Sequence, residues 1–195
     1  MIDHLPKQRP MAFIAACVLG ILLCAFYPSD LASYRVADTQ PVPAWAEQTE
    51  THLRFINTIV QVGLPLLLMD KAGMVELAYV AVTATIATHG LKWLVNDMHV
   101  EGTRLGERPY SPDSNHNMPS GHSSMASCAA YFVIRRYGRW HALYLVPIML
   151  MTMATRYILH AHTISAVLAG CLIGLACAAW CTSRYRFKTP SEKLE

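Results

Sequence analysis

Four long stretches of the chain carry almost no charge: residues 12–26, 74–91, 143–159 and 164–181. An apolar helix of about 18–20 residues is long enough to cross about 30 Å of hydrocarbon, because each residue adds about 1.5 Å. The composition agrees, since 53% of the 195 residues are hydrophobic and only 15% are charged. The pattern predicts an all-α, polytopic membrane protein rather than a soluble domain.

Two weaker apolar stretches bring the expected number of membrane-spanning helices to about six. The six spans are residues 11–27, 56–69, 74–95, 120–134, 140–160 and 163–182. We treat the chain, residues 1–195, as a single integral-membrane domain. A signal peptide is the competing interpretation of the first span, because Lys7 and Arg9 precede it. However, Tyr27-Pro28-Ser29-Asp30 does not resemble a small-residue cleavage site, which favours a membrane anchor.

The connections between the spans have different characters. Residues 28–48 are expected to be extended near the interface, and residues 47–55 to form an amphipathic helix. Residues 70–73 are expected to form a tight turn, and residues 96–118 a long polar loop of the kind that often carries function. Gly170 and Gly174 stand four residues apart, which predicts a helix face that packs closely against a neighbour.

The distribution of basic residues predicts the orientation in the membrane. With six spans, ten of the 16 Lys and Arg residues fall on the side that holds both termini. Because cytoplasmic loops are enriched in Lys and Arg, this side is expected to be cytoplasmic. Lys92, Arg108, His122, Arg156 and His162 then all fall at the outer ends of spans three to five. In a bacterium, this arrangement corresponds to an inner-membrane protein with a periplasmic site.

These residues suit the chemistry of phosphate. Lys and Arg neutralise phosphoryl oxygens, and the Arg fork matches paired oxygens. Histidine can serve as nucleophile or proton donor near neutral pH. Backbone N–H groups at Ser120 and Gly121, where a helix is expected to begin, favour a bound anion. Ser120 is expected to contact phosphate or to cap that helix.

We expect no metal, cofactor or nucleic-acid partner. No cluster of Asp and Glu surrounds the two histidines in a pattern typical of a metal site. All six cysteines lie in apolar stretches, where they are most simply small hydrophobic residues. The expected partners are therefore a phosphorylated lipid and the bilayer itself.

The motif-bearing region, residues 89–170, resembles the type 2 phosphatidic acid phosphatase superfamily. That family combines Lys, six residues and Arg-Pro with Pro-Ser-Gly-His and with Ser-Arg, five residues, His, three residues and Asp. Here Pro119–His122 reproduces the middle motif, and Thr155-Arg156 followed after five residues by His162 matches most of the third. Two departures stand out: 15 residues separate Lys92 from Arg108-Pro109, and Ala166 occupies the Asp position.

The same departures make the chain similar to the short lipid A 1-phosphatases of Gram-negative bacteria. The resemblance implies that His162 attacks phosphorus to form a phosphohistidine and that His122 protonates the leaving oxygen. It also implies that Lys92, Arg108 and Arg156 hold the phosphoryl oxygens. Water then releases phosphate on the outer side of the membrane.

The replacement of Asp by Ala166 leaves the orientation of His162 unexplained. In the wider family the Asp would fix the tautomer of the nucleophilic imidazole. A backbone carbonyl, or a loop carboxylate such as Glu101 or Glu107, are the alternatives that the sequence offers.

Several functions remain open at this point. The leading hypothesis is hydrolysis of the 1-phosphate of lipid A. The same chemistry would serve undecaprenyl pyrophosphate, phosphatidylglycerol phosphate, or transfer of phosphate to another lipid. A different class is an inactive lipid-binding membrane protein, which Ala166 suggests. A transporter is disfavoured, because the ionisable residues gather at one membrane face.

Overall fold

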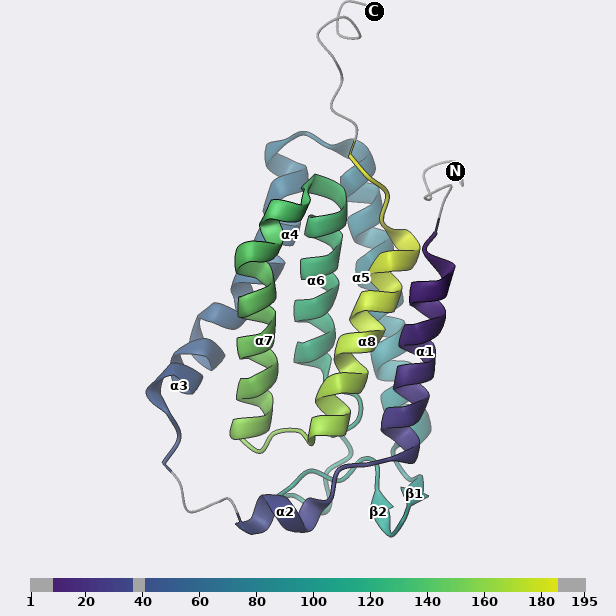
Figure 1. Ribbon diagram of the computed structural model, residues 1–195, viewed down its shortest axis with the longest axis vertical. Helices are drawn as coiled ribbons and strands as arrows, with labels where there is room; N and C mark the ends of the chain where they lie inside the picture. Colours follow the sequence, from purple (N-terminus) through teal and green to yellow (C-terminus); the bar gives the residue numbers. More distant parts are fainter. Residues whose placement is uncertain (1–8, 37–40, 186–195) are drawn as a thin grey trace, which may run out of the picture.

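The protein folds as a bundle of helices that run roughly parallel to one long axis (Figure 1). The structure is a computed structural model, and it describes residues 9–36 and 41–185. Its elements in chain order are α1 (Met11–Phe26), α2 (Leu31–Val36), α3 (Ala44–Thr51), η1 (Leu53–Phe55), α4 (Ile56–Leu67), α5 (Lys71–Val95), β1 (His99–Val100), β2 (Thr103–Arg104), α6 (Gly121–Tyr137), η2 (Arg139–His141), α7 (Ala142–Ile158) and α8 (Ile164–Cys181).

Helix α6 lies at the centre of the bundle and packs against α4, α5, α7 and α8. Its small residues, among them Ala126 and Ala129, are buried and let the neighbouring helices approach. The closest approach is to α8. A Cβ atom added at Gly170 or Gly174 would collide with the backbone oxygen of Ser120 or Ser124. The close-packing face expected from these two glycines is therefore confirmed.

The two ends of the bundle differ in character. Helix α1 begins and α8 ends at one end, whereas α2, the β1–β2 hairpin and the first residues of α6 lie at the other (Figure 1). At the first end Arg136 binds Asp70 with Nε at 2.5 Å and Nη2 at 2.7 Å, and its Nη1 binds Glu76 at 2.8 Å. All three side chains are buried. Because each charge has a partner, the group can join α5 to α6 inside the protein.

Most of the expected spans correspond to helices, and residues 96–118 are largely a loop as expected, but two predictions about the connections were wrong. Residues 70–73 are not a turn: Asp70 caps α5 by accepting a hydrogen bond from the Gly73 N–H, so the helix begins at Lys71. The connection expected to be extended contains α2, and the polar loop contains the antiparallel β1–β2 pair. Both elements are too short to give a periodic hydrophobic pattern. Lys7, which precedes the first span, and residues 186–195 lie outside the described residues.

The outer surface of the bundle carries large apolar side chains. Leu22 on α1, Ile59 on α4, Ile86 on α5 and Leu143 on α7 are all at least half exposed. A water-soluble monomer rarely exposes so much apolar surface, which favours contact with lipid. By length and composition, α5 and α8 could each cross a membrane, and α1 and residues 53–67 are shorter apolar helices. The expected number of six spans therefore stays a prediction.

Candidate active site

His162 lies in the short loop between α7 and α8, at the end of the bundle that holds α2. Its side chain is buried, and Nδ1 lies 2.7 Å from the backbone oxygen of Asn117. A carbonyl oxygen can only accept a hydrogen bond, so Nδ1 must carry the proton and donate it. The other nitrogen, Nε2, therefore keeps its lone pair. This is the tautomer that a nucleophilic imidazole needs.

The carbonyl that orients His162 is itself held in place by the Asn117 side chain. Its Oδ1 accepts a hydrogen bond from the Thr163 N–H at 3.0 Å, and its Nδ2 lies 3.2 Å from Thr163 Oγ1. The Asn117 N–H also donates to the backbone oxygen of Gly106 at 3.1 Å. The loop before α6 is thereby tied to the first residues of α8. Of the alternatives that the sequence offered, the structure shows the backbone carbonyl.

Three cations act on His162. Burial and the positive charges of Lys92, Arg156 and Arg108 lower the pKa of the His162 imidazole from 6.5 to about 2. Each cation comes from a different part of the chain: Lys92 from α5, Arg108 from the loop after β2, and Arg156 from the last turn of α7. The hydrogen bond to Asn117 opposes this lowering of the pKa but is weaker than burial and each of the three charges. The imidazole is therefore neutral at physiological pH in the absence of an anion.

His122 lies in the first turn of α6, and its Nε2 is 3.2 Å from Nη1 of Arg54. A guanidinium can only donate, so Nε2 accepts and the neutral ring carries its proton on Nδ1. Arg54 is in η1 and was not among the residues singled out in the sequence. The structure thus adds a cation beside the second histidine.

Glu50, at the end of α3, connects Arg54 with Arg156. Its Oε1 is 2.7 Å from Nη1 of Arg156 and also forms an ion pair with Nη1 of Arg54. Arg156 in turn accepts a hydrogen bond on its backbone oxygen from the His162 N–H at 3.1 Å. A continuous chain of contacts therefore runs from His122 through Arg54, Glu50 and Arg156 to His162.

The remaining predicted residues take distinct places. Lys92 donates to the backbone oxygen of His116 at 2.7 Å, next to the residue that orients His162. Ser120 caps α6: its hydroxyl accepts from the Ser123 N–H and hydroxyl, and the side chain is fully buried. Gly121 faces open space, because a Cβ atom there would meet nothing within 4 Å. Direct contact of Ser120 or Gly121 with phosphate stays a prediction.

Ala166, at the position where the wider family has Asp, has no side-chain group that could hold the His162 ring. It is fully buried in an apolar cluster with Leu105, Met118 and Ala169. Within the described part of the chain, no group of three or more His, Cys, Asp or Glu side chains is arranged to hold a metal ion. The site as described is a set of cations around two neutral histidines.

The structure thus places a buried imidazole beside several cations at one end of a helical bundle, an arrangement that suits phosphoryl transfer at a histidine. The comparison with known proteins agrees. Residues 73–190 match the model of the PAP2 superfamily, and the chain belongs to this superfamily.

Similar proteins cover most of the chain. A lipid A 1-phosphatase of Helicobacter pylori strain J99 is 40% identical over 181 residues, which is 93% of this chain and 92% of that protein. A lipid A 4'-phosphatase of the same strain is 36% identical over 138 residues, or 70% of this chain and 69% of that protein. Among solved structures, a transmembrane PAP2-type phosphatidylglycerolphosphate phosphatase from Bacillus subtilis is similar in fold. It has a TM-score of 0.63 and 20% identity over 86% of this chain and 92% of that one.

Proposed function

We propose that this protein is a lipid A 1-phosphatase that forms a phosphohistidine on His162. The observation that carries the proposal is the orientation of His162, whose Nδ1 donates to the Asn117 carbonyl and leaves Nε2 available for attack. Similarity to the lipid A 1-phosphatase of Helicobacter pylori, over nearly the whole of both chains, supports the substrate.

The reaction would proceed in two steps. In the first, Nε2 of His162 attacks phosphorus, the bond from phosphorus to the sugar oxygen breaks, and His122 gives that oxygen a proton. In the second, water attacks the phosphohistidine, His122 accepts a proton from the water, and the P–N bond breaks to release inorganic phosphate. Lys92, Arg108 and Arg156 would neutralise the phosphoryl oxygens in both transition states.

The contact with Arg54 would make the protonation state of His122 depend on whether substrate is bound. Without an anion, Nε2 of His122 accepts from Arg54 and carries no proton. A phosphate that draws Arg54 toward its own oxygens would release Nε2. It would also offset the surrounding positive charge and so favour protonation. His122 would thus become an acid when there is a substrate to protonate.

The site would face the periplasm, with both termini in the cytoplasm. Support comes from the arginines at the end of the bundle away from the histidines, among them Arg135, Arg136 and Arg139. A reporter enzyme active only in the periplasm, fused to the C-terminus, tests this orientation. We expect the fusion to be inactive, and an active fusion would contradict the orientation.

The substrate is tested with purified protein and lipid A that carries phosphates at both the 1 and 4' positions. Mass spectrometry with fragmentation should show loss of the 1-phosphate only, and His162→Ala should abolish it. Phosphatidylglycerol phosphate and undecaprenyl pyrophosphate serve as competing substrates. Loss of the 4'-phosphate, or faster hydrolysis of either competing lipid, would overturn the assignment. Full activity of His162→Ala would exclude the phosphohistidine.

A further inference from the structure

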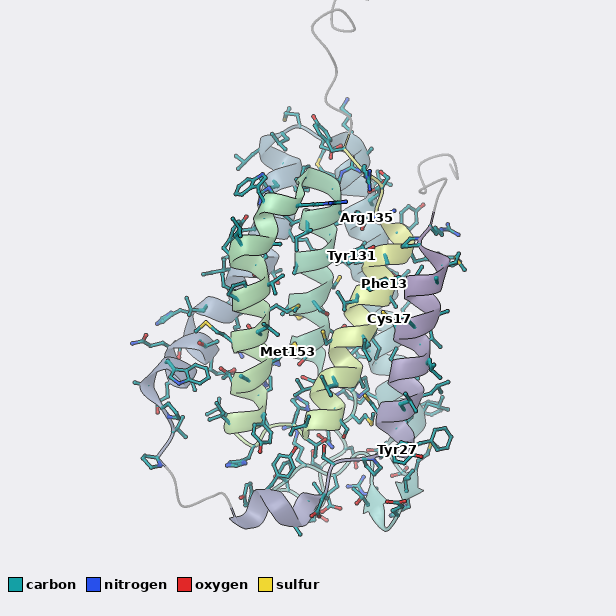
Figure 2. The ribbon with its side chains drawn as sticks, viewed as in Figure 1. Phe13, Cys17, Tyr27, Tyr131, Arg135 and Met153 are labelled. Carbon is teal, nitrogen blue, oxygen red and sulfur yellow. The ribbon has the colours of Figure 1, made fainter. Side chains whose placement is uncertain are left out.

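A cavity of about 660 Å³ lies at the end of the bundle away from the two histidines. It opens between α7 and α8, and α6 forms its floor. Arg135, Arg136, Arg139 and Arg184 line its outer end, whereas Tyr131, Ile134, Met149 and Leu175 are among the side chains that line the rest. In Figure 2, Arg135 lies nearer the end of the bundle than Tyr131, and both lie between the ribbons of α7 and α8.

The arginines of this cavity differ in the hydrogen bonds and ion pairs that they form within the protein. Arg136 forms ion pairs with two buried carboxylates, those of Asp70 and Glu76. Arg135 donates from Nε to the backbone oxygen of Thr182 at 2.8 Å. Arg139 and Arg184 are exposed, and in residues 9–36 and 41–185 neither forms an ion pair with a carboxylate.

Arg139 and Arg184 therefore make the outer end, or rim, of the cavity positively charged. No acidic side chain of the described chain lines the cavity. Arginine forks suit phosphate oxygens, and basic pockets between membrane helices favour anionic headgroups. A zwitterionic headgroup would bring an ammonium group toward the same arginines. The rim therefore favours a lipid with net negative charge over one with none.

Along its length the cavity changes from charged to apolar, as a phospholipid does from its headgroup to its acyl chains. Tyr131 precedes Arg135 by one turn of α6, which places it about 6 Å farther from the end of the bundle. Met149 of α7 and Leu175 of α8 add apolar walls. A phosphodiester at the arginines would thus have its first acyl carbons against an apolar surface. A free phosphate would leave that surface uncovered.

We propose that this cavity binds an anionic phospholipid, with its phosphodiester at Arg139 and Arg184 and an acyl chain along α6 between α7 and α8. The lipid would belong to the leaflet at the opposite end of the bundle from the catalytic histidines. It would join the ends of the two helices, α7 and α8, whose other ends flank His162. Binding would stabilise the folded protein by mass action.

The proposal is tested by native mass spectrometry of the full chain with equal amounts of phosphatidylglycerol and phosphatidylethanolamine. We expect wild-type protein to bind phosphatidylglycerol at least several-fold more than phosphatidylethanolamine. The double variant Arg139→Gln/Arg184→Gln should lose this preference. Lys71→Gln is the matched control, because Lys71 is an exposed cation at the same end that does not line the cavity.

Two further measurements separate this cavity from the catalytic site. Hydrolysis by the double variant in detergent should stay within about twofold of wild type, because neither arginine is near the histidines. Excess inorganic phosphate should not displace the bound phosphatidylglycerol. Equal binding of the two lipids by wild type, an unchanged preference in the double variant, or displacement by inorganic phosphate would each overturn the proposal.

Discussion

The backbone oxygen of Asn117 lies 2.7 Å from Nδ1 of His162, within hydrogen-bond distance of the ring. A carbonyl can fix the tautomer of the imidazole as a carboxylate does, because both accept the Nδ1 proton. It carries no full negative charge, so it stabilises a positively charged ring less. The low pKa of His162 agrees with this difference, since nearby cations and burial outweigh the hydrogen bond.

The Asn117 side chain should matter for catalysis although it touches no reacting atom. In Asn117→Ala the carbonyl remains, but its connection to Thr163 is lost. A small misplacement of a nucleophile can cost about 100-fold in rate. We expect kcat to fall about 10- to 100-fold while KM changes little, measured as initial rates of phosphate release.

Asn115→Ala is the control for this prediction, because Asn115 is exposed two residues earlier in the same loop. Its activity should match wild type. Thermal unfolding should separate the two variants as well, because Asn117→Ala leaves the buried Thr163 N–H without its acceptor, which typically costs about 1–3 kcal/mol. An Asn117→Ala protein with wild-type kcat would show that the connection to Thr163 is not needed.

Most of the candidate site could be predicted from local patterns. His122, Arg156 and His162 lie within short motifs, and the helices that carry them follow from long apolar stretches. Lys92 could be placed because its span ends where the polar loop begins. These predictions needed only the residue spacing and the assumption that span ends on one side of the membrane lie together.

Glu50 and Arg54 could not be predicted in this way. Arg54 is 68 residues from His122, and Glu50 is 106 residues from Arg156. Their contacts arise because α3 and η1 pack against α7, and no pattern in the sequence predicts that packing. The ion pair of Glu50 and Arg54 at positions i and i+4 resembles any solvated helix pair. The orienting role of Asn117 was hidden for a similar reason, since every residue has a carbonyl.

Restoring the acidic residue of the family should harm this protein. Ala166 is fully buried among apolar side chains, so the carboxylate in Ala166→Asp would lose its hydration without a prepared partner. We expect a lower unfolding temperature and no gain in activity. Ala166→Asn is the matched control for size, and it should be less destabilised because it adds no charge. Higher activity in Ala166→Asp than in wild type would show that the Asn117 carbonyl is an inferior substitute.

The low pKa of His162 predicts how the free protein responds to acid. In the unfolded chain a histidine titrates near 6.5, whereas in the folded protein His162 stays neutral to a much lower pH. The folded state therefore binds fewer protons below about pH 6.5, and the free energy of unfolding should decrease as the pH falls from there. His162→Gln removes this group, so its stability should fall less steeply between about pH 6.5 and 4.

Nuclear magnetic resonance of histidine-labelled protein provides the direct measurement. The His162 ring should remain neutral and protonated on Nδ1 throughout this pH range when no phosphate is present. In Lys92→Gln one of the charges acting on His162 is gone, so the pKa should rise toward its ordinary value. A wild-type His162 that titrates near pH 6.5 would mean that burial and the cations do not lower its pKa as described.

The carboxylate of Glu50 should compete with phosphate for Arg156. Its Oε1 lies 2.7 Å from Nη1 of Arg156 and pairs with Arg54, so an incoming phosphoryl group must displace it or share these donors. In Glu50→Gln the negative charge is gone, and inorganic phosphate should inhibit at a several-fold lower concentration. At the same time kcat should fall, because Arg156 and Arg54 lose the contact that positions them and product leaves more slowly. Glu47→Gln, an exposed change of the same charge on the same helix, controls for the overall electrostatic effect. Equal phosphate inhibition in the two variants would mean that Glu50 does not occupy the phosphate position.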